Sequence, residues 1–209
     1  MVNKMKIYYL FDPLCGWCYG ASATLQKLNE IYPLTLTPTG LFYQSGRKMD
    51  ADFARYAWSN DQRIEKLTGQ PFSQAYLENV LQGLGEFNSA NSLLALTAVQ
   101  QIVPEKELVV LAALQKARYV DGLDNADLMV VEQVLHKLNL SQVVPLLSEQ
   151  STKVALEQRL QFGQQLANHC GVQGVPQLIV EKDERLHIVP SQLLYGDVQG
   201  LKDYLQRLP

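Results

Sequence analysis

The first part of the chain alternates a short apolar run with an amphipathic stretch. Residues 6–11 are apolar and rich in aromatic side chains, which predicts a buried strand. Residues 19–31 carry apolar or small side chains at helical spacing, and residues 34–37 alternate with a period of two. A strand, a helix and a strand in this order predict a βαβ unit.

Helical periodicity dominates the middle of the chain. Predicted helices cover residues 50–67, a segment that opens at Pro71, residues 89–103, a segment that opens at Pro104, and residues 128–138 and 152–170. Gly171 follows the last of them, where the end of a helix favours a residue with left-handed backbone. We therefore expect a large helical segment followed by a connecting helix.

The strand pattern returns near the C-terminus. Residues 177–180 predict a strand, residues 181–184 a charged turn, and residues 186–189 the hairpin partner of that strand. Residues 201–208 predict a terminal helix. The layout is a βαβ half and a ββα half with helices between them, which is an α/β fold with a large all-helical insertion.

Chain length is consistent with that division. The chain has 209 residues, of which 47% are hydrophobic, and domains commonly run to about 50–200 residues. We predict one domain from residues 1–47 together with 151–209, and an inserted helical subdomain from residues 48–150.

Charge and apolar runs narrow the class of partner. The net charge of −3 gives no electrostatic reason to expect binding to nucleic acid or to an anionic membrane. No apolar run approaches the ~20 residues of a membrane-spanning helix. The basic start of the chain is followed only by the apolar residues 7–11, whereas a secretory signal needs ~7–15 apolar residues. We therefore expect a cytoplasmic protein that binds neither nucleic acid nor membrane.

The chemistry is concentrated in Cys15-Gly16-Trp17-Cys18, between the first predicted strand and helix. Cysteines at positions i and i+3 share one helix face, so the two sulfurs can meet. The start of a helix stabilises a thiolate, which is the nucleophilic form of cysteine. A Cys-x-x-Cys at this junction predicts a thiol–disulfide site.

Two structural roles for these cysteines are the alternatives. A zinc site needs about four ligands, and the other candidates are Cys170 and its neighbour His169. Adjacent residues on a helix point in different directions, so we predict no metal site. The second alternative is a pair of unreactive buried cysteines, but in a reducing cytosol an isolated Cys-x-x-Cys is more often catalytic.

The order of elements, with Cys15-Gly16-Trp17-Cys18 after the first strand and Gly174-Val175-Pro176-Gln177 before the late hairpin, resembles the thioredoxin fold in its DsbA-like branch. Residues 11–20 are similar to the active-site segment of cytosolic DsbA-like proteins related to the FrnE group. The resemblance implies a thiol–disulfide oxidoreductase. DsbA itself has Pro-His between its cysteines, and Trp17 cannot stabilise a thiolate as that histidine does. We therefore expect a less oxidising pair of the isomerase or reductase type.

The resemblance also implies roles for individual residues. Cys15 is the attacking thiol and Cys18 the resolving one. A cis peptide joins Val175 to Pro176, whose loop lies against the cysteines and presents the Val175 backbone to an extended substrate.

Three nearby side chains are further candidates. Trp17 and Tyr19 are expected to shape the substrate-facing surface, with the protein core as the alternative place for Tyr19. Asp12, three residues before Cys15, is a candidate for proton transfer to or from Cys18. Its alternative role is a turn that ends the strand before Pro13.

Dithiol–disulfide exchange needs no dissociable cofactor. Substrates would be proteins or small molecules that contain a disulfide or thiol, with glutathione or a thioredoxin system as redox partner. The alternative enzyme is a glutathione-dependent isomerase or transferase of the 2-hydroxychromene-2-carboxylate isomerase or kappa class, where glutathione is a co-substrate. The non-enzymatic alternative is a peptide-binding chaperone module.

Overall fold

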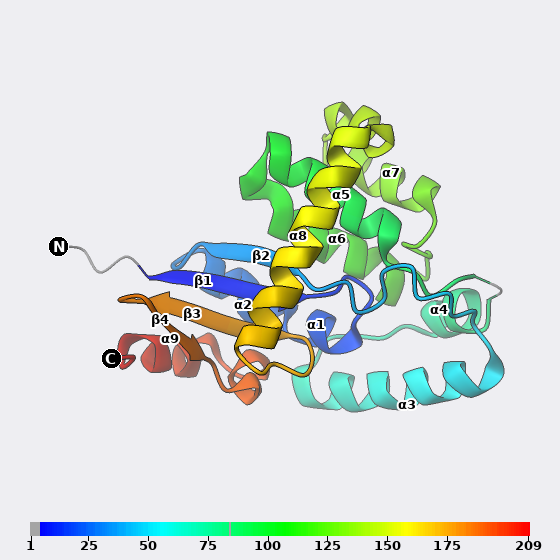
Figure 1. Ribbon diagram of the computed structural model, residues 1–209. Coiled ribbons are helices and arrows are strands. Elements are labelled where there is room, and N and C mark those ends of the chain that lie inside the picture. The colour runs from blue at the N-terminus through cyan, green and yellow to red at the C-terminus, as the bar shows by residue number, and fades with distance from the viewer. Residues whose placement is uncertain (1–4, 84) are drawn as a thin grey trace.

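The computed structural model describes residues 5–83 and 85–209, in which four strands form one mixed sheet (Figure 1). The strands are β1 (Lys6–Phe11), β2 (Leu34–Pro38), β3 (Gln177–Lys182) and β4 (Arg185–Ile188). Their order is β2-β1-β3-β4, and β1 runs parallel to β2 but antiparallel to β3. The predicted βαβ and ββα halves are therefore present, joined through the central strand β1. Residues 1–4 of the predicted thioredoxin-like part and residue 84 of the predicted insert lie outside the described residues.

Helices make up most of the remaining chain. They are α1 (Gly16–Gly20), α2 (Ser22–Asn29), α3 (Ala51–Thr68), α4 (Gln74–Tyr76), a π-helical turn (Leu77–Leu81), α5 (Ala90–Ile102), α6 (Glu107–Tyr119), α7 (Leu128–Lys137), α8 (Gln150–His169) and α9 (Val198–Gln206). Short 3₁₀ segments cover Pro104–Lys106, Ser141–Ser148 and Ser191–Tyr195. In the part of the chain that the structure describes, no helix is both long enough and apolar enough to cross a membrane.

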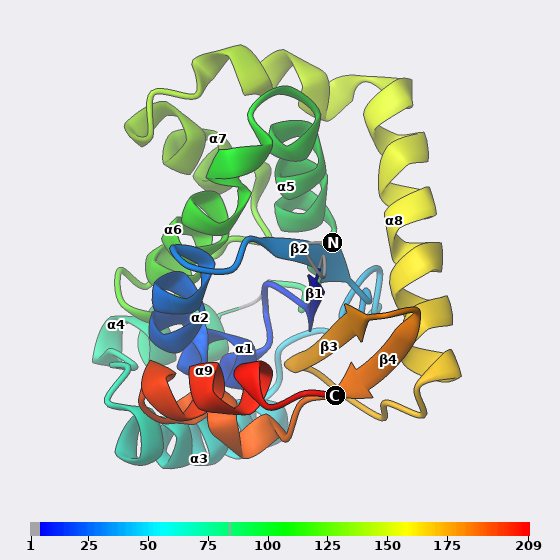
Figure 2. The same cartoon turned by 90° about the vertical axis from the view of Figure 1, so that its left-hand side faces the viewer.

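Helices cover both faces of the sheet (Figure 2). Side chains alternate between faces along a strand, so Tyr9 and Phe11 pack with the cysteines and with residues of α2 and α9. Tyr8 and Leu10 face the other way and pack with the C-terminal part of α8. Burial on both faces explains why the first strand is apolar at nearly every position.

Helix α8 is tied closely to the edge strand β2. A Cβ on Gly163 would lie 2.1 Å from the carbonyl oxygen of Pro38, so only glycine permits this approach. The Arg159 guanidinium donates to the Leu36 carbonyl oxygen at 3.0 Å and forms an ion pair with Glu107 of α6. The connecting helix therefore joins the sheet to the helical segment.

Two local predictions differ from the structure. The helix expected over residues 19–31 is two helices, α1 and α2, with Ala21 between them. Helix α1 approaches α3 so closely at Gly20 that a Cβ there would lie 2.6 Å from Ile64. Pro71 does not open the next helix, because the Ser73 side chain caps α4 instead. The first difference involves a contact with a distant helix, whereas the second reflects a local capping residue that competes with Pro71.

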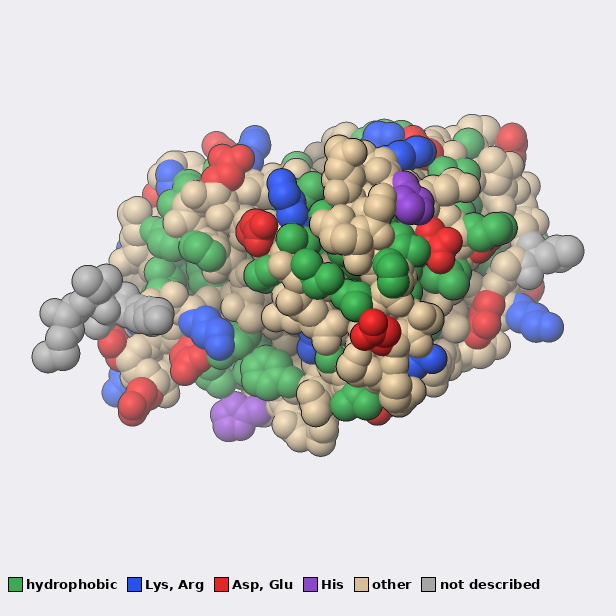
Figure 3. All heavy atoms as spheres, turned by 90° about the horizontal axis from the view of Figure 1, so that it is seen from above, with side chains coloured by type: hydrophobic (Ala, Val, Ile, Leu, Met, Phe, Trp, Pro, Cys, Tyr) green, Lys and Arg blue, Asp and Glu red, His purple; other side chains and the backbone are tan. Residues whose placement is uncertain are grey.

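The surface seen in Figure 3 carries acidic and basic side chains interspersed with apolar ones. Neither sign of charge gathers into a continuous area on that face. This distribution agrees with the small net charge of −3.

Candidate active site

The two cysteines lie at the start of α1. Cys15 is the residue before the helix, with extended backbone, and its carbonyl oxygen accepts the Tyr19 N–H at 3.1 Å. Both cysteines are free thiols. The exposed fraction is 6% for Cys15 and 0% for Cys18. Cys15 is therefore the thiol that an incoming disulfide can reach, and Cys18 lies behind it.

Cys18 holds its proton strongly. Burial raises the pKa of the Cys18 thiol well above its ordinary value, and the hydrogen bond and charge of Cys15 raise the pKa further. The two thiols thus lie close enough for each to act on the other. Because only a thiolate attacks a disulfide, Cys18 needs help to lose its proton at neutral pH.

The loop before β3 lies against the Cys15 thiol. The Cys15 Sγ donates a hydrogen bond to the Val175 carbonyl oxygen at 3.5 Å, across 160 positions of sequence. The peptide between Val175 and Pro176 is cis. Val175 is half-buried and Pro176 is buried. The fold therefore brings together the two sequence motifs that carried the family resemblance.

Trp17 and Tyr19 point to different surroundings. Trp17 is half-buried and meets Tyr195 edge to face, with ring centroids 5.3 Å apart. Tyr19 is buried and stacks on Tyr119 with centroids 4.7 Å apart, and its hydroxyl donates to the Pro71 carbonyl oxygen. Burial raises the pKa of Tyr19 to about 12. Tyr19 thus occupies the core, which was the alternative place expected for it.

Asp12 is fully buried between three hydrogen-bond donors. Its carboxylate accepts the backbone N–H groups of Leu14 and Phe42 at 2.9 and 3.0 Å, and the Ser89 hydroxyl at 2.9 Å. Burial raises the pKa of Asp12 although these hydrogen bonds lower it. The bond to Leu14 is the turn contact expected of an Asp that ends a strand. A role in proton transfer to Cys18 stays a prediction.

A cleft of about 730 Å³ opens beside Cys15. Ligand sites commonly measure about 300–1,000 Å³. One wall carries Cys15, Trp17 and Val175. The opposite wall comes from α3, α4 and neighbouring loops and includes Phe42, Arg47, Phe53, Tyr56, Asn60, Asp61, Tyr76 and Phe87. The helical segment therefore shapes the space into which a substrate of Cys15 would fit.

Asp61 is a buried acid in this cleft. Its Oδ2 accepts the Tyr76 hydroxyl at 3.0 Å. Burial raises the pKa of Asp61 to about 7, although the Tyr76 hydrogen bond and the charge of Arg118 lower it. A Cβ on Gly16 would lie 2.5 Å from Asp61 Oδ1. The carboxylate therefore lies directly against the segment that holds the two cysteines.

Sequence reasoning missed Asp61, although a signal was present. Ala54, Asp61 and Ile64 are the buried residues of α3 and are separated by seven and three positions, which places them on one helix face. An acid on an otherwise apolar face is unusual, because burial of a charged group is costly. That pattern marks Asp61 from the sequence alone.

Cys170 lies apart from the dithiol. It packs with Tyr8 and Leu10 on the opposite face of the sheet. Among residues 5–83 and 85–209, no group of three or more His, Cys, Asp or Glu side chains could hold a metal ion. The structure therefore does not bring Cys170 together with Cys15 and Cys18.

Comparisons with known proteins agree with this geometry. A family model described as the DSBA-like thioredoxin domain matches residues 6–196. No curated protein matches the chain. Among solved structures, the cytosolic disulfide reductase DsbM from Pseudomonas aeruginosa is similar, with 28% identity and a TM-score of 0.87, over 96% of this chain and 97% of that one. A structure of DsbM with GSH is similar at 27% identity, with a TM-score of 0.86, over 96% of this chain and 97% of that one.

Two further structures complete the comparison. A candidate protein disulfide isomerase from Nitrosomonas europaea has 25% identity and a TM-score of 0.79, over 99% of this chain and 100% of that one. A 2-hydroxychromene-2-carboxylate isomerase has 17% identity and a TM-score of 0.59, over 96% and 94%, which is evidence for the fold alone. The predicted thioredoxin fold with a helical insertion is confirmed, and the chain belongs to the DSBA-like thioredoxin-domain family.

Proposed function

We propose that this protein is a thiol–disulfide oxidoreductase of the reductase or isomerase type, with Cys15 and Cys18 as its redox pair. The observation that carries the proposal is the position of the Cys15 sulfur. It lies at the start of α1, against the Val175 carbonyl oxygen and at the wall of the cleft. The buried Cys18 thiol lies close behind it.

The reaction has two exchange steps. The Cys15 thiolate attacks one sulfur of a substrate disulfide, and the other substrate sulfur leaves as a thiolate that takes up a proton. Cys18 then loses its proton and attacks the Cys15 sulfur of the mixed disulfide. The second substrate thiolate leaves, so the substrate gains two electrons and the Cys15–Cys18 disulfide forms. The reverse sequence oxidises a dithiol, and relative reduction potentials decide the direction.

Substrate contacts are assigned to the residues around the exposed sulfur. In the proposal, Trp17, Val175 and Pro176 contact the substrate, whose extended backbone pairs with that of Val175. Tyr19 supports this surface from the core. Asp12 is the proposed proton-transfer group for Cys18, because its charge already acts on that thiol.

The surroundings of the reaction are proposed from the relatives. DsbM is described as a cytosolic disulfide reductase and has been solved with GSH. By similarity we propose a cytoplasmic location here, with glutathione as redox partner and a thioredoxin system as the second choice. We also propose that residues 48–150 form a subdomain that sets the substrate, because α3 and α4 supply one wall of the cleft.

Equilibration in glutathione buffers tests the proposal. The Cys170→Ser protein should form a Cys15–Cys18 disulfide. A reduction potential of this pair of about −270 mV would indicate a reductase, whereas about −120 mV would indicate an oxidase. Failure to form any such disulfide would refute the dithiol mechanism.

Single cysteine variants separate the alternatives. Cys18→Ser should accumulate a mixed disulfide on Cys15 and lose turnover, because no resolving thiol remains. A glutathione-dependent isomerase would stay active after this change. Peptide binding that survives loss of both cysteines, with no disulfide turnover in the native protein, would favour the chaperone alternative.

A further inference from the structure

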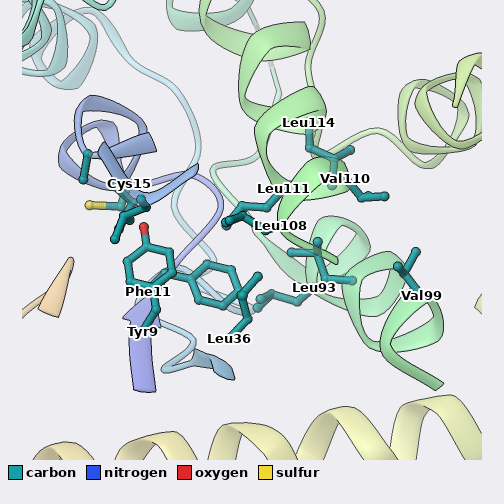
Figure 4. Packing of buried hydrophobic residues seen from close by; sticks show 14 of the residues in the cluster. Tyr9, Phe11, Cys15, Leu36, Leu93, Val99, Leu108, Val110, Leu111 and Leu114 are labelled. Carbon is teal, nitrogen blue, oxygen red and sulfur yellow. The ribbon is translucent and has the colours of Figure 1, made fainter. Parts of the chain in front are cut away.

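Tyr9 presents an unpartnered hydroxyl beneath the redox pair. Its side chain is 1% exposed, and its hydroxyl oxygen has no hydrogen-bond partner among the residues that the structure describes. The ring stacks on Phe11 with centroids 5.4 Å apart, which restrains its direction. Figure 4 shows the hydroxyl oxygen directed at the segment that carries Cys15. A buried hydroxyl without a partner is destabilising, and nearly all such groups in folded proteins are paired.

Both thiols lie close to this hydroxyl in the same core cluster. Burial raises the pKa of Tyr9 well above its ordinary value, and the neighbouring Cys18 and Cys15 thiols raise it further. The raised pKa means that the hydroxyl keeps its proton near neutral pH. It can therefore donate a hydrogen bond to a neighbouring thiolate.

We propose that the Tyr9 hydroxyl donates a hydrogen bond to the Cys18 sulfur when that thiol loses its proton, and so assists the attack of Cys18 on the mixed disulfide. This inference rests on the proposed function. No proton leaves Tyr9 in the step: the Cys18 proton passes to the Asp12 carboxylate, the proton-transfer group proposed above. The new bond forms between the two cysteine sulfurs, the bond from Cys15 to the substrate sulfur breaks, and the substrate thiolate departs.

The other groups around Cys18 do not take this role. Cys15 is consumed in the mixed disulfide at this stage. The backbone of Asp12 lowers the pKa of the Cys18 thiol through a hydrogen bond, whereas the charge of its carboxylate raises that pKa and so opposes the thiolate. Tyr195 is affected by the charges of Cys18 and Cys15, but its hydroxyl is not one of the buried groups that lack a partner, as the Tyr9 hydroxyl is. Tyr9 is therefore the side chain whose free hydroxyl can add a second donor to the resolving sulfur.

Ellman's reagent separates the two exchange steps. In a Cys170→Ser background, attack by Cys15 releases one coloured thiolate, and attack by Cys18 on the resulting mixed disulfide releases a second. Tyr9→Phe should leave the first phase unchanged. The rate of the second phase depends on pH, and the midpoint of that dependence should rise by about one pH unit. This is the effect of losing a hydrogen bond to a charged sulfur. The rate of the second phase at neutral pH should fall about threefold, because the higher nucleophilicity of a more basic thiolate partly offsets its smaller population.

Tyr8→Phe is the matched control, since Tyr8 lies on the same strand but donates to Glu181 from the opposite face of the sheet. It should change neither phase. Fluorotyrosine at position 9 keeps the ring and makes the hydroxyl a stronger donor, so the second midpoint should fall. This second variant decides the question if Tyr9→Phe folds poorly.

The outcomes are distinct. A second phase that has the native rate and pH midpoint in Tyr9→Phe would overturn this inference and leave the redox pair intact. Release of only one thiolate by the native dithiol would instead overturn the proposed function, and this inference with it.

Discussion

Replacing Asp61 with asparagine tests the cost of an ionised carboxyl group in the cleft wall. Asp61→Asn keeps the size of the side chain and an oxygen that can accept the Tyr76 hydroxyl. The variant removes only the charge. Its effect on stability should therefore depend on pH in a way that follows from the pKa of Asp61.

The sign and size of the expected stability change follow from the linkage between protonation of Asp61 and folding. The pKa of Asp61 is raised from 3.8 to about 7, mainly by burial. Protonated Asp61 thus contributes stability that is fully present below the unfolded pKa and is lost as pH rises through about 7. A shift of about three units corresponds to about 4 kcal/mol, and relaxation around the charge reduces this to about 2–4 kcal/mol. Asp61→Asn should raise the free energy of unfolding by that amount at alkaline pH and by little near the unfolded pKa.

Urea unfolding at about pH 4.5 and about pH 8 measures this difference. The urea concentration at the unfolding midpoint reports stability when the dependence of the free energy of unfolding on urea concentration is unchanged. The control is Asp52→Asn on the same helix, where an exposed ion pair with Arg55 is lost. It should change stability by less than about 1 kcal/mol at either pH. An equal gain at both pH values for Asp61→Asn, or a loss at alkaline pH, would contradict the reasoning.

Three other substitutions test packing and the separation of the cysteines. Gly163→Ala should lower the free energy of unfolding by about 1–3 kcal/mol or more, measured by urea unfolding, because its Cβ would meet the Pro38 carbonyl oxygen at 2.1 Å. Gly16→Ala should cost less in the same assay, since the group in the way is the Asp61 side chain, 2.5 Å from the new Cβ, which can move. A cost larger than that of Gly163→Ala would show that Asp61 cannot move. Cys170→Ser should leave both thiolate-release rates of Ellman's reagent unchanged, because Cys170 packs on the other face of the sheet.

Local sequence signals were enough for most elements of the fold. The apolar run at β1 and the hairpin of β3 and β4 appear where they were predicted, and Gly171 has the left-handed backbone (φ 66°) expected after α8. Each signal depends on residues close together in the chain. The extra break at Ala21 was missed because α3 meets α1 from about 45 positions away, through contacts such as that between Gly20 and Ile64.

In the candidate site too, some residues were predicted from local spacing and others were not. The proposed redox pair was visible from the spacing of Cys15 and Cys18, because two thiols three positions apart on one helix face can meet. The position of Val175 beside Cys15 was predicted from the family resemblance. No local pattern relates these two residues, because they are 160 positions apart in the chain.

By itself, the sequence determined the class of chemistry, the order of strands and helices, and the helical segment between the two halves. Only the tertiary structure decided the environment of that chemistry. Packing buried Tyr19 in the core, set Asp61 against Gly16 and directed the Tyr9 hydroxyl at the thiols. Burial and electrostatic contact depend on which distant segments pack together, so a pKa or an unpartnered hydroxyl cannot be deduced from local periodicity.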